Sequence, residues 1–369
     1  MKILFEKDQL IKSINISLKA IATRTTDELS NCIHIRAAEN VYFTTNDSEM
    51  WIKTMVPAVI EETGAVAVNA RLFSDIIKKL PAQSVHLTIE GTEARITSGQ
   101  AKFKIPCLSL DGVDDVPEIN RDYTMQINGF SLREMVRKTI FCAAQGESGN
   151  YTMLGEKIEI DKDVLRITAL DGCRIGVYNV TLDKEYPANS CIVPAKTLQE
   201  ISRIIRGETD ELVEIVITDK HILFILEETV LLSRLISGSF FQFERLVSDD
   251  YELKVRVNKN EITESVDRSL LLSRESDTQP LVLRIGEEMR LSIRSKLGRM
   301  NESLTIEKEQ DVDTVFGVNP RYVIEALKAI DDEEINMYFI SNNAPMLIRD
   351  DAKTYVYILL PVSFVDEGE

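Results

Sequence analysis

The strongest constraint in this sequence is a threefold internal repeat. Three segments share a short lead-in containing Asn or Pro, followed by apolar residues at helical spacing. These segments are residues 69–80, 194–206 and 319–330. Their equivalent basic residues, Arg71, Lys196 and Arg321, are 125 residues apart at both steps. Because self-similarity at a fixed period marks a repeat architecture, the 369 residues are predicted to form three related domains of about 123 residues each.

Each repeat combines two helical patterns with several strand patterns. An earlier helical pattern precedes each segment above, and these earlier patterns are residues 9–22, 131–144 and 261–274. Alternation of apolar and polar residues, as in residues 84–97 and 212–218, indicates strands of antiparallel sheets. The predicted fold class is therefore α+β. The predicted domains are residues 1–122, 123–250 and 251–369. No low-complexity linker separates them, so we expect them to share continuous sheets or tight contacts.

Cysteine and histidine usage argues against a disulfide framework or a metal site. The five cysteines are odd in number and never in a C-x-x-C spacing, so they are expected to be reduced and mostly buried. His34, His86 and His221 each lie in a strand-like stretch without a second ligand at metal spacing. No cofactor or metal is expected. The longest apolar run is too short for a membrane span and no signal peptide is recognised, so a cytoplasmic protein without a membrane partner is expected.

The charge of the chain is strongly negative in sum but not in its distribution. With 60 acidic and 43 basic residues the formal net charge is −17, which taken alone argues against a nucleic-acid partner. In the later helix of each repeat, however, two basic positions recur seven residues apart, as Arg71 and Lys78 do in the first. They differ by only about 20° around the helix and lie about 170° from the apolar stripe. Each of the three later helices is therefore predicted to have a core face on one side and a cationic face on the opposite side.

A cationic face repeated in register favours binding of a polyanion through its phosphates. The earlier helices of the first two repeats add further cations, whereas that of the third offers only Arg268 and Arg274 beside Glu264 and Asp267. The sequence has no zinc finger, RNA-recognition aromatic signature or basic arm, so backbone contact without sequence specificity is what remains. The alternative is that these lysines and arginines form an ordinary solvated helix face.

Four motifs extend the pattern beyond the repeated helices. They are Leu170–Ile175 after a strand pattern, Ile192–Lys196, Gly238–Leu246 and the ending Tyr357–Val362. In their order and spacing, and together with three units of near-equal length, these motifs resemble the bacterial sliding clamp, the beta subunit of DNA polymerase III. Each motif is weak alone, but the resemblance covers essentially the whole chain.

The resemblance implies a head-to-tail homodimer whose six domains close into a ring, with helices lining the hole and sheets outside. Such a ring encircles duplex DNA and tethers the replicative polymerase, so the chain is implied to be a non-catalytic processivity factor of DNA replication. The implied partners are duplex DNA, a second copy of the chain, the polymerase catalytic subunit, the clamp loader, repair polymerases and mismatch-repair factors. The implied location is the cytoplasm, at the nucleoid during replication.

The helix cations and the contacts implied by the family together give the candidate DNA-binding residues. Arg24 and the Asn150–Tyr151 pair come from the family, and the alternatives are an ordinary loop cation for Arg24 and a core or rim aromatic for Tyr151. The full set is Lys12, Lys19, Arg24, Arg71, Lys78, Lys79, Arg133, Arg137, Lys138, Asn150, Tyr151, Lys196, Arg203, Arg206, Arg321 and Lys328.

The resemblance also implies a cleft between the second and third domains that receives a short, partly apolar peptide carried by partner proteins. An apolar groove with two arginines at its edge suits the side chains and backbone of such a peptide. The alternative for the C-terminal run is a terminal strand that simply packs on the core. Matched by motif, the peptide-binding set is Met153, Leu170, Gly172, Arg174, Ile175, Phe241, Arg245, Leu246, Pro345, Met346, Ile358, Leu359, Leu360, Pro361 and Val362.

For the subunit interface the matching residues are Phe103 from the first domain and Leu271 and Leu272 from the third, with core packing as the alternative. The chain also departs from the family pattern. Cys173 stands where the family often has His, Phe241 stands where it often has Pro, and residues 363–369 continue beyond the usual end. These departures leave the peptide preference open.

Two other classes of function were weighed against this one. An enzyme is disfavoured because the chain has no G-x-x-x-x-G-K, H-E-x-x-H or G-x-S-x-G motif. A repeat scaffold that binds only proteins through its acidic exterior stays open, and it predicts that the helix cations are dispensable.

Overall fold

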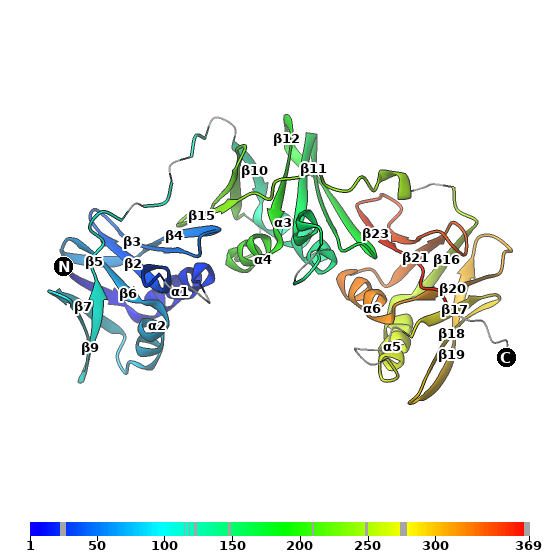
Figure 1. The fold of residues 1–369 in the computed structure, drawn as a ribbon, viewed down its shortest axis with the longest axis horizontal. Coiled ribbons are helices and arrows are strands. Elements are labelled where there is room, and N and C mark those ends of the chain that lie inside the picture. Colours follow the sequence, from blue (N-terminus) through cyan, green and yellow to red (C-terminus); the bar gives the residue numbers. More distant parts are fainter. Residues whose placement is uncertain are drawn as a thin grey trace. The chain divides into compact units, whose positions relative to one another are not determined.

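The contacts of the chain divide it into two compact units, and the division falls inside the second repeat. The computed structural model describes residues 1–22, 27–113, 115–117, 119–121, 124–146, 149–208, 210–247, 250–273 and 279–364. Unit 1 comprises residues 1–130 and 199–235, and unit 2 comprises residues 131–198 and 236–369 (Figure 1). The second repeat therefore contributes strands to both units.

Unit 1 is built on one antiparallel sheet of 13 strands among the residues described, in the order β10-β13-β14-β15-β4-β3-β2-β6-β9-β8-β7-β1-β5. The bounds are β1 Lys2–Glu6, β2 Cys32–Ala37, β3 Val41–Asn46, β4 Met50–Val56, β5 Ala58–Glu62, β6 Gly64–Asn69, β7 Ser84–Glu90, β8 Glu93–Ser98, β9 Ala101–Leu108, β10 Thr124–Asn128, β13 Leu212–Ile217, β14 His221–Ile225 and β15 Thr229–Arg234. Strand β15 of the second repeat pairs with β4 of the first, from Thr229 opposite Thr54 to Ser233 opposite Met50. Of the alternatives that the sequence left for this join, the pairing shows a continuous sheet.

Unit 2 has a second antiparallel sheet, of 10 described strands, in the order β11-β12-β23-β22-β21-β16-β19-β18-β17-β20. The bounds are β11 Gly155–Leu170, β12 Arg174–Pro194, β16 Leu253–Asn258, β17 Leu281–Ile285, β18 Glu288–Ser295, β19 Gly298–Lys308, β20 Thr314–Val318, β21 Glu334–Phe339, β22 Met346–Arg349 and β23 Tyr355–Leu359. Here β12 of the second repeat pairs with β23 of the third, from Arg174 opposite Leu359 to Tyr178 opposite Tyr355.

The described residues contain all six predicted helices. These are α1 Lys7–Ser17, α2 Ala70–Lys79, α3 Gly129–Thr139, α4 Ala195–Ile204, α5 Lys259–Leu270 and α6 Pro320–Ala329. The earlier helix of each repeat ends before its predicted end, and α1 and α3 pass into short 3-10 turns, η1 Leu18–Ala20 and η3 Ile140–Cys142. Three short 3-10 turns also occur in loops, η2 Leu29–Asn31, η4 Tyr151–Leu154 and η5 Glu244–Leu246. Asn69 and Asn319 cap α2 and α6, where their side chains accept hydrogen bonds from the backbone N–H groups of Leu72 and Arg321.

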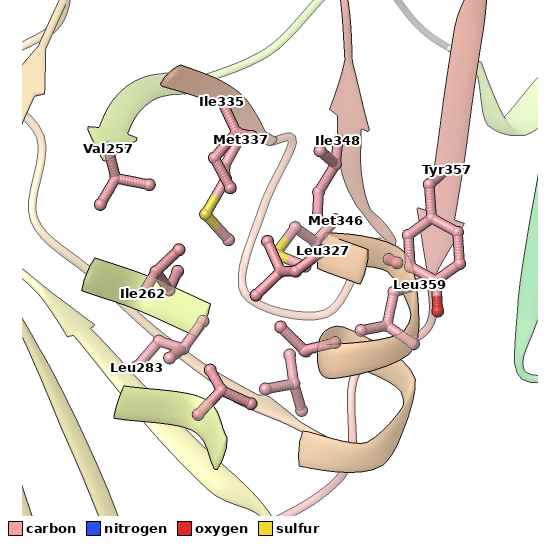
Figure 2. Packing of buried hydrophobic residues seen from close by; sticks show 14 of the residues in the cluster. Val257, Ile262, Leu283, Leu327, Ile335, Met337, Met346, Ile348, Tyr357 and Leu359 are labelled. Carbon is pink, nitrogen blue, oxygen red and sulfur yellow. The ribbon is translucent and has the colours of Figure 1, made fainter. Parts of the chain in front are cut away.

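The predicted apolar stripe of the later helices forms part of the core. On α6, for example, the side chains of Val323 and Ala326 are at most 1% exposed. Phe73 and Leu198, which are equivalent to Val323 in the other repeats, are fully buried. In unit 1, Phe43 packs edge-to-face against Phe5 and Phe73. In unit 2, helices α5 and α6 contact each other and cover side chains from β16, β21, β22 and β23 (Figure 2).

The cysteines and histidines lie where the sequence predicts. All five cysteines are free thiols, four of them buried, and only Cys173 is exposed. His34, His86 and His221 lie on strands β2, β7 and β14. Within the described part of the chain no group of His, Cys, Asp and Glu side chains could hold a metal ion. No helix in that part is long and apolar enough to cross a membrane.

A fully buried carboxyl group lies between α3 and β11 in unit 2. The hydroxyl Oγ1 of Thr139 is 2.5 Å from Glu156 Oε2 and 2.8 Å from the backbone oxygen of Met135, and its single proton can serve only one of them. The other oxygen of Glu156, Oε1, has no hydrogen-bond partner in the described structure. Burial raises the pKa of Glu156 from 4.5 to about 8. A protonated Glu156 supplies the missing second proton, so geometry and burial agree on a neutral acid.

The variant Glu156→Gln is expected to gain stability over the parent chain as pH rises. Between pH 4.5 and about 8 the folded chain holds a proton on Glu156 that the unfolded chain has lost, so a rise in pH within this window lowers the free energy of unfolding. The change is up to about 1.4 kcal/mol per pH unit, and Gln does not titrate. Urea unfolding at several pH values should show the advantage of the variant growing up to about pH 8 and then levelling off. Asp161→Asn, an exposed change on the same strand, is the control. An advantage that is constant from acid to alkaline pH would contradict a buried, titrating Glu156.

Candidate functional site

The later helix of the first repeat presents the clearest cationic face. On α2 the side chains of Arg71, Lys78 and Lys79 are exposed, while Phe73 and Ile77 on the opposite side are buried. Among the described residues, none of these three cations takes part in an ion pair. The sequence pattern of opposed core and cationic faces is therefore realised on α2, with its charges available to a polyanion.

One cation of the turn η1 and one of α4 share a carboxylate in unit 1. Lys19 Nζ lies 2.9 Å from Glu200 Oε2, and Arg203 Nη1 lies 2.8 Å from Glu200 Oε1. The Glu200 side chain is only 12% exposed, so this pairing is stronger than a typical surface ion pair. Lys12 and Arg206 are exposed on the same unit. Lys19 and Arg203 therefore carry less free charge than the sequence alone suggests.

A second carboxylate, Asp331, neutralises part of the cationic face of α3 in unit 2. Arg137 Nη2 is 2.6 Å from Asp331 Oδ2 and also pairs with Glu134, and Lys138 Nζ is 3.0 Å from the same Asp331 oxygen. Burial alone would raise the pKa of Asp331, but Lys138 and Arg137 outweigh it and hold that pKa below its ordinary value. Arg133, one turn earlier on α3, is exposed.

The earlier helix of the third repeat offers the least free positive charge, as predicted. On α6, the later helix of this repeat, Lys328 is exposed and Arg321 is half-buried. On α4, the later helix of the second repeat, Lys196 is exposed. The exposed face of α5 is acidic at Glu264 and Asp267, and Arg268 on that helix pairs with Glu302 at 2.7 Å.

Of the two loop positions implied by the family, the structure describes only the Asn150–Tyr151 pair. Arg24 lies outside the described residues. Asn150 begins the turn η4, where its Oδ1 accepts hydrogen bonds from the backbone N–H of Thr152 at 3.1 Å and from its hydroxyl at 2.8 Å. Tyr151, next to it, is 75% exposed, so the core alternative is excluded for this ring. An exposed aromatic held by a capped turn is free to contact a partner.

Unit 2 has a second apolar cluster, separate from the core beneath the helices. Five of the predicted peptide-binding side chains belong to it. We call it the sheet-face cluster. Its buried members are Leu170, Ile175, Val177, Phe243, Tyr338, Leu347, Val356 and Ile358, and its partly buried members are Met153, Phe240, Leu246, Val247, Tyr251 and Ile340. Of these, Met153, Leu170, Ile175, Leu246 and Ile358 were predicted from motifs. Four others come from the strands β12, β21, β22 and β23, at positions that the strand period could have revealed, namely Val177, Tyr338, Leu347 and Val356. The rest lie outside the strands and are Phe240, Phe243, Val247, Tyr251 and Ile340.

The pleat of the sheet separates two predicted peptide-binding residues from the rest. Successive side chains of a strand point to opposite faces, so Ile358 belongs to the sheet-face cluster while Leu359 belongs to the core beneath the helices. Met346, which pairs with Leu359, also faces that core (Figure 2). Both side chains are completely buried, so neither is available to a partner.

The remaining predicted residues differ in their burial. Gly172, Phe241, Arg245 and Leu360 are exposed, and Phe241 and Leu360 are 50% and 38% exposed respectively. Pro345, Pro361 and Val362 are half-buried. The exposed aromatic and aliphatic side chains of this set are the ones that a partner could cover.

Arg174 has a structural position rather than the expected place at the edge of a groove. Its side chain is 8% exposed, pairs with Asp171 and Glu325, and donates from Nη2 to the backbone oxygen of Phe141. The guanidinium carbon lies 4.2 Å from the centre of the Tyr322 ring. Because its donors and its flat faces are occupied internally, Arg174 fixes the turn 171–174 instead of offering a free charge.

Besides the terminal strands of the two sheets, β5, β10, β11 and β20, two strands inside the sheet orders have edges that lack strand partners over most of their length. In β9, residues 101–106 pair only with β8, because pairing with β6 is confined to Cys107 and Leu108. In β19, residues 298–305 pair only with β18, because pairing with β16 begins at Ile306. These statements concern the described residues. An exposed strand edge is a template for pairing with another chain.

The three predicted interface residues lie on or beside these edges. Phe103, on β9, is 40% exposed. Leu271 follows α5 and is 79% exposed, which excludes core packing for it. Leu272 is partly buried against the core of unit 2, and its Cδ2 lies 3.7 Å from where a Cβ of Gly298 would stand, at the start of β19.

Comparison with known proteins gives one consistent result. Sequence models of the DNA polymerase III beta subunit match residues 1–120 with its N-terminal domain, 126–242 with its central domain and 244–363 with its C-terminal domain. The beta sliding clamp of Bacillus subtilis is 30% identical over 377 residues, which cover 98% of this chain and 99% of that protein. The crystal structure of the Bacillus subtilis DNA polymerase sliding clamp superimposes with a TM-score of 0.93 over 99% of this chain and 100% of that one.

A solved structure from Eubacterium rectale, assigned as a DNA polymerase III beta subunit, is 40% identical with a TM-score of 0.94 over 99% of this chain and 100% of that one. The chain therefore belongs to the DNA polymerase III beta subunit family, the beta sliding clamps, and is a DNA sliding clamp and replication processivity factor rather than an enzyme.

Proposed function

We propose that two copies of this chain join head to tail into a ring around duplex DNA, that the helix cations face the DNA, and that partners bind through the sheet-face cluster. The observation that carries the proposal is the cationic face opposed to a buried stripe on α2 and repeated on α4 and α6. A polyanion bound through its phosphates fits such a surface, and the contacts need no base recognition.

The structure supports a graded set of DNA contacts. Exposed cations without an ion pair, such as Arg71 and Lys78, are proposed as the principal contacts. Lys19, Arg137 and Lys138 share carboxylates and are proposed as weaker ones. Weak, non-specific contacts suit a ring, because encirclement alone keeps it on the DNA while it moves.

Reversing the charge of the α2 cations is expected to shorten retention on DNA. A chain with Arg71→Glu, Lys78→Glu and Lys79→Glu, loaded onto nicked circular DNA, should dissociate several-fold faster at about 0.1 M salt, because each lost phosphate contact weakens binding. Its control carries Lys184→Glu, Lys220→Glu and Lys296→Glu, three exposed lysines outside the helices. Cutting the DNA to a linear form should release every variant. Retention on DNA that is unchanged by both the α2 substitutions and the cut would reject encirclement.

The open edges of β9 and β19 support the proposed subunit interface. They belong to the first and third repeats, so pairing β9 of one copy with β19 of another is heterologous, and two such contacts can close a ring. Lys102 and Lys104 give the open part of β9 a positive charge, whereas the open part of β19 carries one charge of each sign, Arg299 and Glu302. The exposed side chains of Phe103 and Leu271 flank these edges.

A charge at Leu271 is expected to dissociate the dimer without unfolding the chain. Leu271→Asp places a carboxylate on a side chain that is 79% exposed in a single copy, so the thermal midpoint of the monomer should hardly change. At the interface the same carboxylate would be buried, and the dimer dissociation constant should rise at least about tenfold. Sedimentation at a series of concentrations measures it. Val59→Asp, at an exposed valine on β5, is the control, and equal dimerisation by both variants would remove Leu271 from the interface.

For partner binding we propose a short apolar peptide that covers exposed side chains at the margin of the sheet-face cluster, chiefly Phe241 and Leu360 beside Arg245. The polymerase catalytic subunit, the clamp loader, repair polymerases and mismatch-repair factors would carry such peptides. A strip of apolar side chains with one nearby cation matches a peptide of mixed apolar and acidic character. Bound in this way, the protein would act at the nucleoid.

Two neighbouring leucines at the end of β23 are expected to respond differently to substitution. Leu360→Asp should weaken binding of a peptide from the replicative polymerase at least about tenfold, with an unchanged thermal midpoint, because this side chain is exposed. Leu359→Ala should instead cost about 2–4 kcal/mol of stability, because that side chain is completely buried. Fluorescence anisotropy and thermal unfolding separate the two effects. Undiminished peptide affinity of Leu360→Asp would contradict this placement of the peptide site.

A further inference from the structure

The segment that follows β23 is held by backbone contacts at two separate places. The N–H of Leu360 donates to the backbone oxygen of Cys173 at 2.9 Å, beside the turn that ends β11. The N–H of Val362 donates to the backbone oxygen of Gly317 at 2.8 Å, on strand β20. Residues 360–362, which we call the rim, therefore bridge the sheet-face cluster and a strand on a different part of unit 2.

Gly317 is a glycine that this bridge requires. A Cβ at this position would lie 2.4 Å from the backbone oxygen of Val362 and 2.6 Å from Cδ1 of Phe364. Gly317 does not adopt the left-handed backbone region, so its conformation does not demand glycine. Glycine in the interior of a strand is unfavourable and often marks a site where another backbone approaches closely. At β20 the approaching backbone is the rim itself.

Phe364 completes this contact. Its ring lies against Gly317, with Cδ1 and Cε1 at 2.6 and 3.2 Å from the position of the absent Cβ, and the residue is half-buried. Ser363, between it and the rim, is exposed. Holding a segment without secondary structure in one conformation needs an anchor, because ordering each residue costs conformational entropy. The Phe364 ring is the large apolar group that supplies it.

We propose that Phe364, seated on Gly317, is a positioning residue that holds the rim in the conformation that receives the partner peptide. The proposal rests on the peptide site proposed above and adds a residue that does not itself contact the peptide. Without the anchor, the rim past Leu360 keeps one backbone hydrogen bond to β20 and samples other conformations. If the competent rim is then present one tenth of the time, the apparent peptide affinity falls about tenfold.

The test compares four variants of the full-length protein. Phe364→Ala removes the anchor, Gly317→Ala removes its seat, Phe364→Leu keeps an apolar anchor, and Ser363→Ala is the control on the exposed neighbour. Phe364→Ala and Gly317→Ala should each weaken binding of the polymerase-derived peptide about tenfold, and Phe364→Leu should restore much of it. Hydrogen exchange of the Val362 amide should become faster in the two weakened variants only. Ser363→Ala should match the parent chain in both measurements.

The outcomes separate this proposal from the peptide site on which it rests. If Leu360→Asp prevents peptide binding while Phe364→Ala and Gly317→Ala bind normally, the peptide site stands and the positioning role is overturned. If Leu360→Asp itself binds normally, the proposed peptide site fails. Faster exchange of the Val362 amide without loss of affinity would also overturn the positioning role, because the rim would then be loosened without consequence for the peptide.

Discussion

Antiparallel backbone pairing between strands of different repeats is the interaction on which the rest of this structure depends. Residues 50–54 of β4 pair with 229–233 of β15 in unit 1, and residues 174–178 of β12 pair with 355–359 of β23 in unit 2. Each junction satisfies backbone donors and acceptors of two repeats at once, so the repeats need no linkers. The junction in unit 2 also creates the candidate peptide site, because it brings Ile175 and Ile358 opposite each other within one apolar cluster.

The same arrangement determines which face of each later helix is exposed. Each later helix buries one stripe beneath its sheet, and a helix with one face buried must present the opposite face outward. Cations placed half a turn away from the stripe are then exposed without any further design, as Arg71 and Lys78 are on α2. A repeat of 125 residues copies this relation from one helix to the next, so a surface suited to phosphates arises from the period of the sequence and the burial of the core.

The sequence could predict features that depend on neighbouring residues or on the repeat, but not features that depend on pairing between distant strands. The six helices and the strand positions of the three histidines depend on local periodicity or on the repeat, and both were predicted. The helix ends were not, because η1 and η3 continue the apolar pattern in a tighter turn. For the joins between repeats the sequence left continuous sheets and tight contacts as alternatives, and the strand pairing shows continuous sheets. The alternation from Tyr355 to Leu359 does indicate two faces, yet only the pairing with β12 and β22 shows which face holds the core. Motif matching grouped Ile358 with Leu359, and the pleat separates them.

Long-range pairing also changes the meaning of the net charge of −17. Glu200 lies 181 residues from Lys19, and Asp331 lies 194 residues from Arg137, so only the fold reveals these two pairings. The pairing of Glu200 with Arg203, three residues away on α4, is local. These carboxylates lower the free positive charge of η1, α3 and α4, whereas the described cations of α2 form no ion pair. A protein held by affinity alone would lose binding through such pairs. A ring that surrounds its DNA is held by its closure, so partial neutralisation costs it little retention and lowers the barrier to movement along the phosphates.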